Sequence, residues 1–290
     1  MKLIDPSFEI IEQEGSSQDY LYKMIEKCAK TCYKSVNTIT DDSAEKFVDR
    51  LVKAEHYAML EHATVYLKIP FNIPLDLVVK GYSSNPYSWV SIPDNNVHIA
   101  YVTTNYRVIK ENSWEEDLKY MCTPTKYHEK RVTVRFVCSR AVAQEFTRHR
   151  VFSFAMESQR YCNYSRDKFG NEITFIIPDW VNTHCPNKNQ KGPSVVDMEW
   201  STALMNAEAS YFNLLKEGWK PEEAREVLPN STKTELIMTG FVDDWKHFFD
   251  LRALGTTGKP HPEAYRLAFP LMEEFKKMNY IKLNKKKYVK

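Results

Sequence analysis

Basic, hydroxyl and aromatic side chains gather near the middle of the chain. Arg148-His149-Arg150 is followed after seven residues by Ser158, and then by Gln159-Arg160-Tyr161. Guanidinium and aromatic groups together can grip phosphates and stack on a planar ring. Taken alone, a basic triplet is also typical of a solvated helix end that complements the helix dipole.

Glycine usage limits how a nucleotide could be held. The chain has eight glycines, at positions 15, 81, 170, 192, 218, 240, 255 and 258. Neither a dinucleotide-binding GxGxxG motif nor a P-loop can be assembled from them. The phosphates of any bound nucleotide would therefore be held by side chains, chiefly arginines, and by helix N-termini.

Composition indicates an ordinary globular protein of 290 residues, 43% hydrophobic and 27% charged. Its 40 basic and 38 acidic residues leave a net charge of +2, too balanced for a bulk nucleic-acid binder. No membrane span or signal peptide is recognisable, so we expect a cytoplasmic protein. Six cysteines without a CxxC pair, and histidines without an HxxxH pair, predict neither a disulfide scaffold nor a metal site.

The surrounding elements follow from hydrophobic periodicity and capping residues. Helices are predicted over residues 18–33, 41–57, 139–149, 194–217, 232–251 and 262–279, with a short one starting at Pro221. Strands are predicted over residues 63–69, 131–138 and 173–178, and partly over 97–110. This order predicts an α+β fold with a mixed or antiparallel sheet and packed helices, in a single domain over 1–290. Residues 70–128, interrupted by prolines, are interpreted as an elaboration of the core sheet.

The central string resembles the signature of the flavin-dependent thymidylate synthases, in which RHR is followed after seven residues by serine. Leu60-Glu61-His62, Ala224–Pro229 and Phe249–Arg252 resemble further elements of that family. The resemblance covers about residues 45–280, and 70–128 is an insertion relative to compact members.

The resemblance implies reductive methylation of dUMP to dTMP. Methylenetetrahydrofolate would supply the carbon, and FAD, reduced by NADPH, would mediate the transfer in a homotetramer with shared active sites. The near-zero net charge argues against a nucleic-acid partner, and the lack of a long apolar run argues against a membrane partner. The implied FAD-binding residues are Arg148, His149, Arg150, His62, His247 and His261. The implied nucleotide-binding residues are Glu145, Ser158, Arg160, Arg225 and Arg252, of which Ser158 and Arg252 would act in catalysis, Ser158 by orienting the pyrimidine.

Several positions depart from the family pattern. Glu145 stands where a glutamine is common, and Ala155 and Met156 stand where many members have asparagine and glutamate. His247 and Phe241 also replace polar residues, and His261 aligns only loosely.

Some residues also have simpler interpretations. Arg225 could be an ion-paired surface residue, Arg252 could cap its own helix, and His62 could be a core histidine.

Two other functions remain open from the residues. Cys185, beside His184, could be the nucleophile of a different nucleotide methyltransferase, in which case alkylation would abolish turnover. Alternatively, the basic and aromatic residues around Arg160 could bind single-stranded nucleic acid without catalysis. A protein that takes up FAD would argue against the second.

Overall fold

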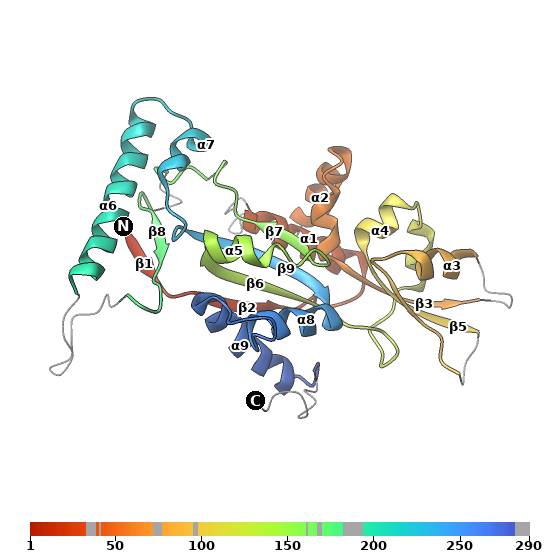
Figure 1. The fold of residues 1–290 in the computed structure, drawn as a ribbon. Helices are drawn as coiled ribbons and strands as arrows, with labels where there is room; N and C mark the ends of the chain where they lie inside the picture. Colours follow the sequence, from red (N-terminus) through yellow and green to blue (C-terminus); the bar gives the residue numbers. More distant parts are fainter. Residues whose placement is uncertain are drawn as a thin grey trace.

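The computed structural model describes residues 1–32, 39–40, 42–71, 77–94, 98–160, 162–166, 170–181 and 194–281. Within these residues the chain forms mostly antiparallel sheets with helices packed against them (Figure 1). The predicted α+β class is therefore confirmed. No helix of the described residues is long and apolar enough to cross a bilayer.

The central sheet has four antiparallel strands in the order β2-β6-β9-β7. They are β2 (Ser7–Ile11), β6 (Arg131–Ser139), β9 (Lys233–Phe241) and β7 (Ser153–Met156). The long pair β6 and β9 runs with Arg131 opposite Phe241 and Ser139 opposite Lys233. The pair therefore has a charged residue at each end, Arg131 on β6 and Lys233 on β9.

The predicted helix over 232–251 is wrong in its first half. Residues 233–241 form strand β9, and only Val242–Arg252 is helical, as α8. β9 lies between β6 and β7 and is buried over nearly its whole length. A strand that is buried on both faces lacks an alternating pattern, so periodicity alone cannot distinguish it from a buried helix.

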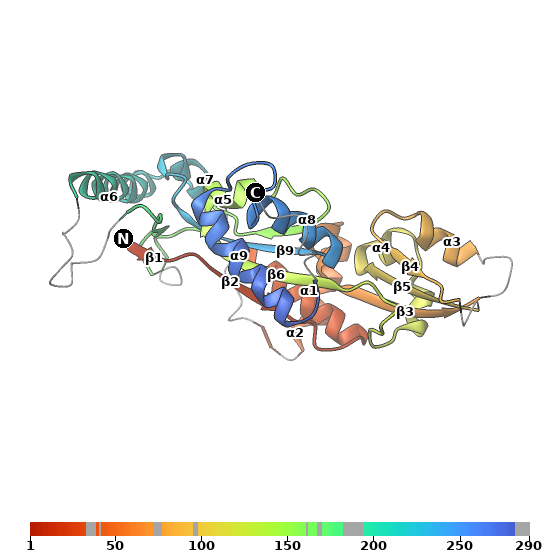
Figure 2. The same ribbon diagram turned by 60° about the horizontal axis from the view of Figure 1, so that its bottom comes forward.

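Helices cover both faces of the central sheet. Leu236 and Met238 pack in the core formed with α5 (Arg140–Phe146), α8 and α9 (Pro262–Lys277). Ile237, between them on the strand, faces Met24 and Cys28 of α1 (Gln18–Cys32). Because side chains alternate along a strand, α1 lies opposite α8 and α9, as the two views also show (Figures 1 and 2).

The predicted insertion does not extend the central sheet, which corrects our interpretation. Within the described residues it pairs with β3 (Thr64–Pro70) in a separate antiparallel sheet, β3-β5-β4. β5 (Ile99–Asn105), which belongs to the insertion, pairs with β3 along its whole length. The remaining elements of this region are α3 (Leu77–Ser84), β4 (Trp89–Ser91), α4 (Tyr106–Glu111) and η3 (Glu115–Tyr120).

A third group of elements lies at the opposite end of the molecule from the insertion (Figure 1). β1 (Lys2–Ile4) pairs in parallel with β8 (Thr174–Ile176). The remaining elements of this end are α6 (Val195–Lys216), α7 (Pro221–Ala224) and η5 (Arg225–Val227). The start of α6 follows from its sequence, because Ser194 and Asp197 form a capping box.

Two predicted helices end earlier than expected. The helix predicted over 41–57 stops at Lys53 as α2 (Ser43–Lys53), since Glu55 has a positive φ of 54°, and a 3₁₀ turn, η2 (Tyr57–His62), follows. The helix capped by Ser139 ends at Phe146 rather than at 149. The Arg148-His149-Arg150 triplet therefore forms the turn between α5 and β7.

Candidate active site

Arg252 at the end of α8 joins the turn that carries the basic triplet. Its Nη1 donates to Glu145 Oε2 at 2.6 Å and its Nη2 to the Glu145 carbonyl at 2.9 Å. Its Nε donates to His149 Nε2 at 3.2 Å. Arg252, Glu145 and His149, three of the predicted site residues, are thus brought together from α8 and from the end of α5 with its following turn. Arg252 is hydrogen-bonded to these protein partners rather than free.

His149 is a neutral base in this arrangement. It is buried, and burial, followed by the charge of Arg252 and then by His247, lowers its pKa to about 4. Because Nε2 accepts the hydrogen bond from Arg252, the ring proton belongs on Nδ1. The ring packs edge-on against Phe248 with 5.1 Å between centroids. His149 is therefore fixed in position, tautomer and charge.

Arg148 and Arg150, on either side of His149, are exposed. Within the described residues no carboxylate lies within ion-pair distance of either guanidinium. Two cationic groups without an internal partner flank a buried neutral imidazole. These two guanidinium groups can bind an anionic ligand without first breaking an ion pair within the protein.

Ser158 lies just beyond β7, on one wall of a cavity of about 540 Å³. Ala155 and Met156 line the same cavity. Arg107 of α4 also lines it and is held by Glu61 at 2.6 Å. The insertion thus contributes a cationic residue to the cavity that contains Ser158.

Arg160 and Arg225 are both located beside acidic residues of the α7–η5 segment. Arg160 Nε is 3.7 Å from Glu222 Oε2, and Arg225 Nε is 3.6 Å from Glu226 Oε1. Both contacts are solvent-exposed, with the Arg160 side chain 59% exposed. Exposed ion pairs of this length contribute little stability. Tyr161 lies outside the described residues, as do His184 and Cys185.

His62 is placed in the interior rather than on a cavity wall. It is fully buried, and its Nδ1 lies 2.8 Å from Thr239 Oγ1 of β9. Burial, with a smaller effect from Arg131, lowers its pKa to about 3. The simpler interpretation of His62 as a core histidine fits this environment, and its contact with FAD stays a prediction.

The two late histidines occupy different surroundings. His247 is exposed and lies beside His149, with 6.0 Å between ring centroids. His261 precedes α9 and packs against Trp180 at 5.9 Å. His247 therefore borders the basic turn, whereas no contact with that turn is seen for His261 among the described residues.

A buried ionic cluster flanks Ser158 and was missed by the sequence analysis. Lys233 Nζ donates to Glu157 Oε2 at 2.8 Å and also to Glu235. Burial alone would lower the pKa of Lys233, but the two carboxylates outweigh it and the pKa is raised. Arg135 completes the cluster by pairing with Glu235 at 2.6 Å. The signal that could have revealed it is the presence of Lys233 and Glu235 within a buried strand that has no other charged residue.

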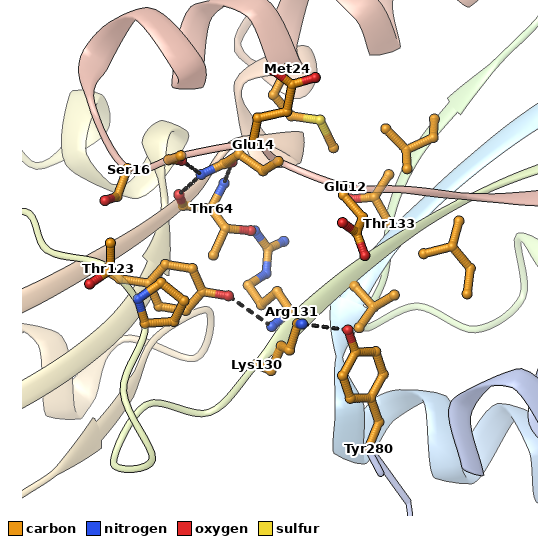
Figure 3. A pocket seen from close by; sticks show the side chains of 17 residues that line it. Glu12, Glu14, Ser16, Met24, Thr64, Thr123, Lys130, Arg131, Thr133 and Tyr280 are labelled. Atoms are coloured by element: carbon orange, nitrogen blue, oxygen red, sulfur yellow. Dashed lines mark hydrogen bonds between the residues drawn. The ribbon is translucent and has the colours of Figure 1, made fainter. Parts of the chain in front are cut away.

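Two further cavities border Arg131 at the start of β6. One, of about 260 Å³, lies between β6 and the segment joining β2 to α1, and none of the predicted site residues lines it. Figure 3 shows Lys130, Arg131 and Tyr280 around this cavity, with Glu14 and Met24 across from them. The other, of about 270 Å³, is lined by Arg131, Arg150 and Phe241 together with residues of the insertion. In the described part of the chain, no group of three His, Cys, Asp or Glu side chains could hold a metal ion.

The sequence model of one protein family, described as "Thymidylate synthase complementing protein", matches residues 127–279, more than half of the chain. The chain belongs to this family. The match contains the basic turn, Ser158, Arg160, Arg225 and Arg252, and begins just where the insertion ends. The predicted resemblance is therefore confirmed at the level of the family.

Named relatives agree with this membership. A flavin-dependent thymidylate synthase of Pyrococcus horikoshii is 30% identical over 145 residues, covering 50% of this chain and 54% of that protein. The enzyme of Corynebacterium diphtheriae is 33% identical over 122 residues, with coverages of 40% and 46%. A probable flavin-dependent thymidylate synthase of Paramecium bursaria Chlorella virus 1 is 31% identical over 134 residues. The chain spans about half the length of these curated relatives.

Among solved structures, the UMP/dUMP methylase PolB from Streptomyces cacaoi is similar over 96% of this chain and 93% of its own. It is 18% identical in sequence, and the TM-score is 0.44.

Proposed function

We propose that this protein is a flavin-dependent thymidylate synthase, a methyltransferase that converts dUMP to dTMP. The observation that carries the proposal is the turn between α5 and β7. There Arg252 fixes a neutral His149, while Arg148 and Arg150 have no ion-pair partner among the described residues. This arrangement lies within the part of the chain that matches the family.

The residues of this turn fit an anionic dinucleotide. Arg148 and Arg150 would hold the phosphates of FAD, since guanidinium groups pair bidentately with phosphate oxygens and no glycine loop is present. His149 would keep its position between them, and the exposed His247 beside it would contact the same cofactor. FAD, when bound, supplies the redox chemistry of the methyl transfer.

Arg160 and Arg225 would bind the phosphate of dUMP. The contacts with Glu222 and Glu226 are long and solvent-exposed, so giving up these two contacts for a phosphate dianion has a small energetic cost. A charge-assisted hydrogen bond to phosphate is stronger than either surface contact. The dUMP phosphate would therefore lie near α7.

Ser158 would orient the pyrimidine rather than attack it. Among the described residues its hydroxyl has no histidine or carboxylate hydrogen-bond partner that could activate it as a nucleophile. Its cavity of about 540 Å³ lies within the size range of ligand sites.

Arg252 and Glu145 would act on the site through His149, because their side chains are already engaged with each other. A direct contact of either residue with dUMP requires that this ion pair opens.

The proposal also takes from the family methylenetetrahydrofolate as the carbon donor, NADPH as the reductant, and a homotetramer with shared active sites. His62 and His261 remain predicted FAD contacts whose roles rest on the resemblance alone.

The decisive experiment measures tritium release from C5-labelled dUMP by the full chain. We expect release with FAD, NADPH and methylenetetrahydrofolate together, and loss of release when any one is omitted. Release that is independent of FAD and is abolished by alkylating Cys185 would favour the cysteine mechanism. Absence of release, with salt-dependent binding of oligonucleotides, would favour the nucleic-acid-binding function.

A further inference from the structure

The cavity of about 270 Å³ beside the basic turn is built from two parts of the chain. Arg131 and Arg150 line it from residues within the family match. Tyr87 and Asn105 line it from the insertion, which lies outside that match. The insertion therefore forms part of a wall next to a predicted FAD-binding residue.

The charge of this cavity favours an anion. Arg131 is buried and donates to the Glu61 carbonyl at 3.0 Å, and more weakly to Thr64 and Ser153. None of the described carboxylates forms an ion pair with it, so its charge is poorly compensated for a buried group. Burial accordingly lowers the pKa of Arg131 to about 10. With Arg150 it faces one cavity carboxylate, Asp244, whose Oδ2 already accepts from the Phe241 N–H at 3.0 Å.

Tyr87, which lines the same cavity, offers an aromatic ring. The residue is 57% exposed, yet its backbone is held in place. Its N–H donates to Asn85 Oδ1 at 2.9 Å, and its carbonyl accepts from Thr104 Oγ1 of β5 at 3.4 Å. A fixed backbone presenting an exposed ring beside two guanidiniums suits a ligand that is planar at one end and phosphorylated at the other.

We propose that the insertion supplies Tyr87 as a ring-stacking residue, and that β6 supplies Arg131 as an anion-binding residue, for the FAD held by Arg150. This inference rests on the proposed function and adds residues to its site. A cavity of about 270 Å³ is smaller than most whole-ligand sites, so it would take one part of FAD. Arg107 reaches the Ser158 cavity from the same insertion, so the insertion borders both predicted ligand cavities.

The test measures the dissociation constant for FAD of the full chain by quenching of flavin fluorescence. We expect Tyr87→Ala to raise it about tenfold, since loss of a stacked aromatic ring typically has an effect of this order. Tyr87→Phe, which keeps the ring, is expected to remain within about twofold of the wild type. Trp89→Ala is the matched control, because Trp89 is also an exposed aromatic residue of the insertion but does not line this cavity.

Arg131 is tested with two probes. Arg131→Lys keeps the charge but loses the planar guanidinium that pairs bidentately with phosphate. It is therefore expected to weaken the binding of FAD about tenfold and to leave the binding of riboflavin, which lacks phosphates, almost unchanged. If Arg131→Lys does not fold, the Tyr87 variants still decide the inference.

The outcomes separate the two proposals. If the wild-type chain and Tyr87→Ala bind FAD equally well, this inference is overturned and the proposed function stands. Wild-type chain that binds no FAD would overturn both.

Discussion

Arg252 and Glu145 lie 107 residues apart in the sequence, yet Arg252 Nη1 and Glu145 Oε2 are 2.6 Å apart. The contact ties the last residue of α8 to the end of α5, and the same guanidinium holds His149. One arginine thereby fixes the turn on which the predicted FAD-binding residues lie.

Breaking this pair is expected to destabilise the protein measurably. Arg252→Ala should lower the free energy of unfolding by about 2 kcal/mol, because a partly buried carboxylate loses its charged hydrogen bonds. A double-mutant cycle with Glu145→Ala in urea denaturation should give a coupling energy of about 1–2 kcal/mol. Strictly additive single effects would show that the pair does not hold the turn.

Acidification should destabilise the protein through His149. Its folded pKa of about 4 lies below the ordinary histidine value of 6.5, so the unfolded chain binds more protons between these values. The stability contribution is complete above pH 6.5 and is lost as the pH falls towards 4. After allowance for solvent screening we expect a loss of about 1–2 kcal/mol.

The comparison for this pH effect uses His149→Gln, which keeps an acceptor but does not titrate. The control is His98→Gln, which removes an exposed histidine of the insertion. Urea denaturation across the interval should show a smaller pH dependence for His149→Gln alone. An unchanged slope in that variant would mean that His149 is not held neutral.

Removing the Arg160 guanidinium should weaken the binding of dUMP, and removing the charge of Glu222, which competes with the phosphate, should strengthen it. We expect Arg160→Ala to raise the dissociation constant about 10- to 100-fold, the effect of losing a charged hydrogen-bond pair. Glu222→Gln should lower it slightly, because the carboxylate 3.7 Å from Arg160 Nε no longer competes with the phosphate. Isothermal titration with dUMP checks both, with Arg50→Ala on α2 as the control. Unchanged affinity in Arg160→Ala would refute its assignment.

Arg148→Ala should lose FAD without unfolding. Because Arg148 is exposed and has no ion-pair partner among the described residues, its removal should change stability by no more than about 0.5 kcal/mol. The bound flavin, measured by absorbance per protein chain, should fall well below that of the wild type. A variant that keeps wild-type flavin stoichiometry would exclude the cofactor role.

Lys233 should be essential to the cluster beside Ser158. Lys233→Met leaves Glu157 and Glu235 without their shared buried cation, and we expect a loss of about 3–5 kcal/mol. Adding Glu157→Gln should restore part of this loss in urea denaturation. Lys246→Met, which breaks the exposed pair with Asp243, should stay within about 0.5 kcal/mol of the wild type. Equal effects of the two lysines would show that burial does not strengthen the cluster.

Local signals identified most of the elements. Ser139 caps α5 as predicted, with its Oγ accepting from the Val142 N–H at 3.2 Å. The alternation over 131–138 marked β6 correctly. β9 was missed because a strand buried on both sides carries no alternating pattern. The Lys233 cluster was missed for the same reason. Charged residues in a predicted helix give no indication that they pair with residues on or beside a neighbouring strand.

By itself, the sequence determined the family and the residues of the basic turn, because the spacing from Arg148-His149-Arg150 to Ser158 is a local property of the chain. It also determined that phosphates could not be held by a glycine loop. Only the tertiary structure decided which arginines are free. Arg252 is bound to Glu145, whereas Arg150 faces a cavity with Arg131 and Tyr87. Ion pairing and burial depend on contacts between segments far apart in the chain, which residue spacing does not encode.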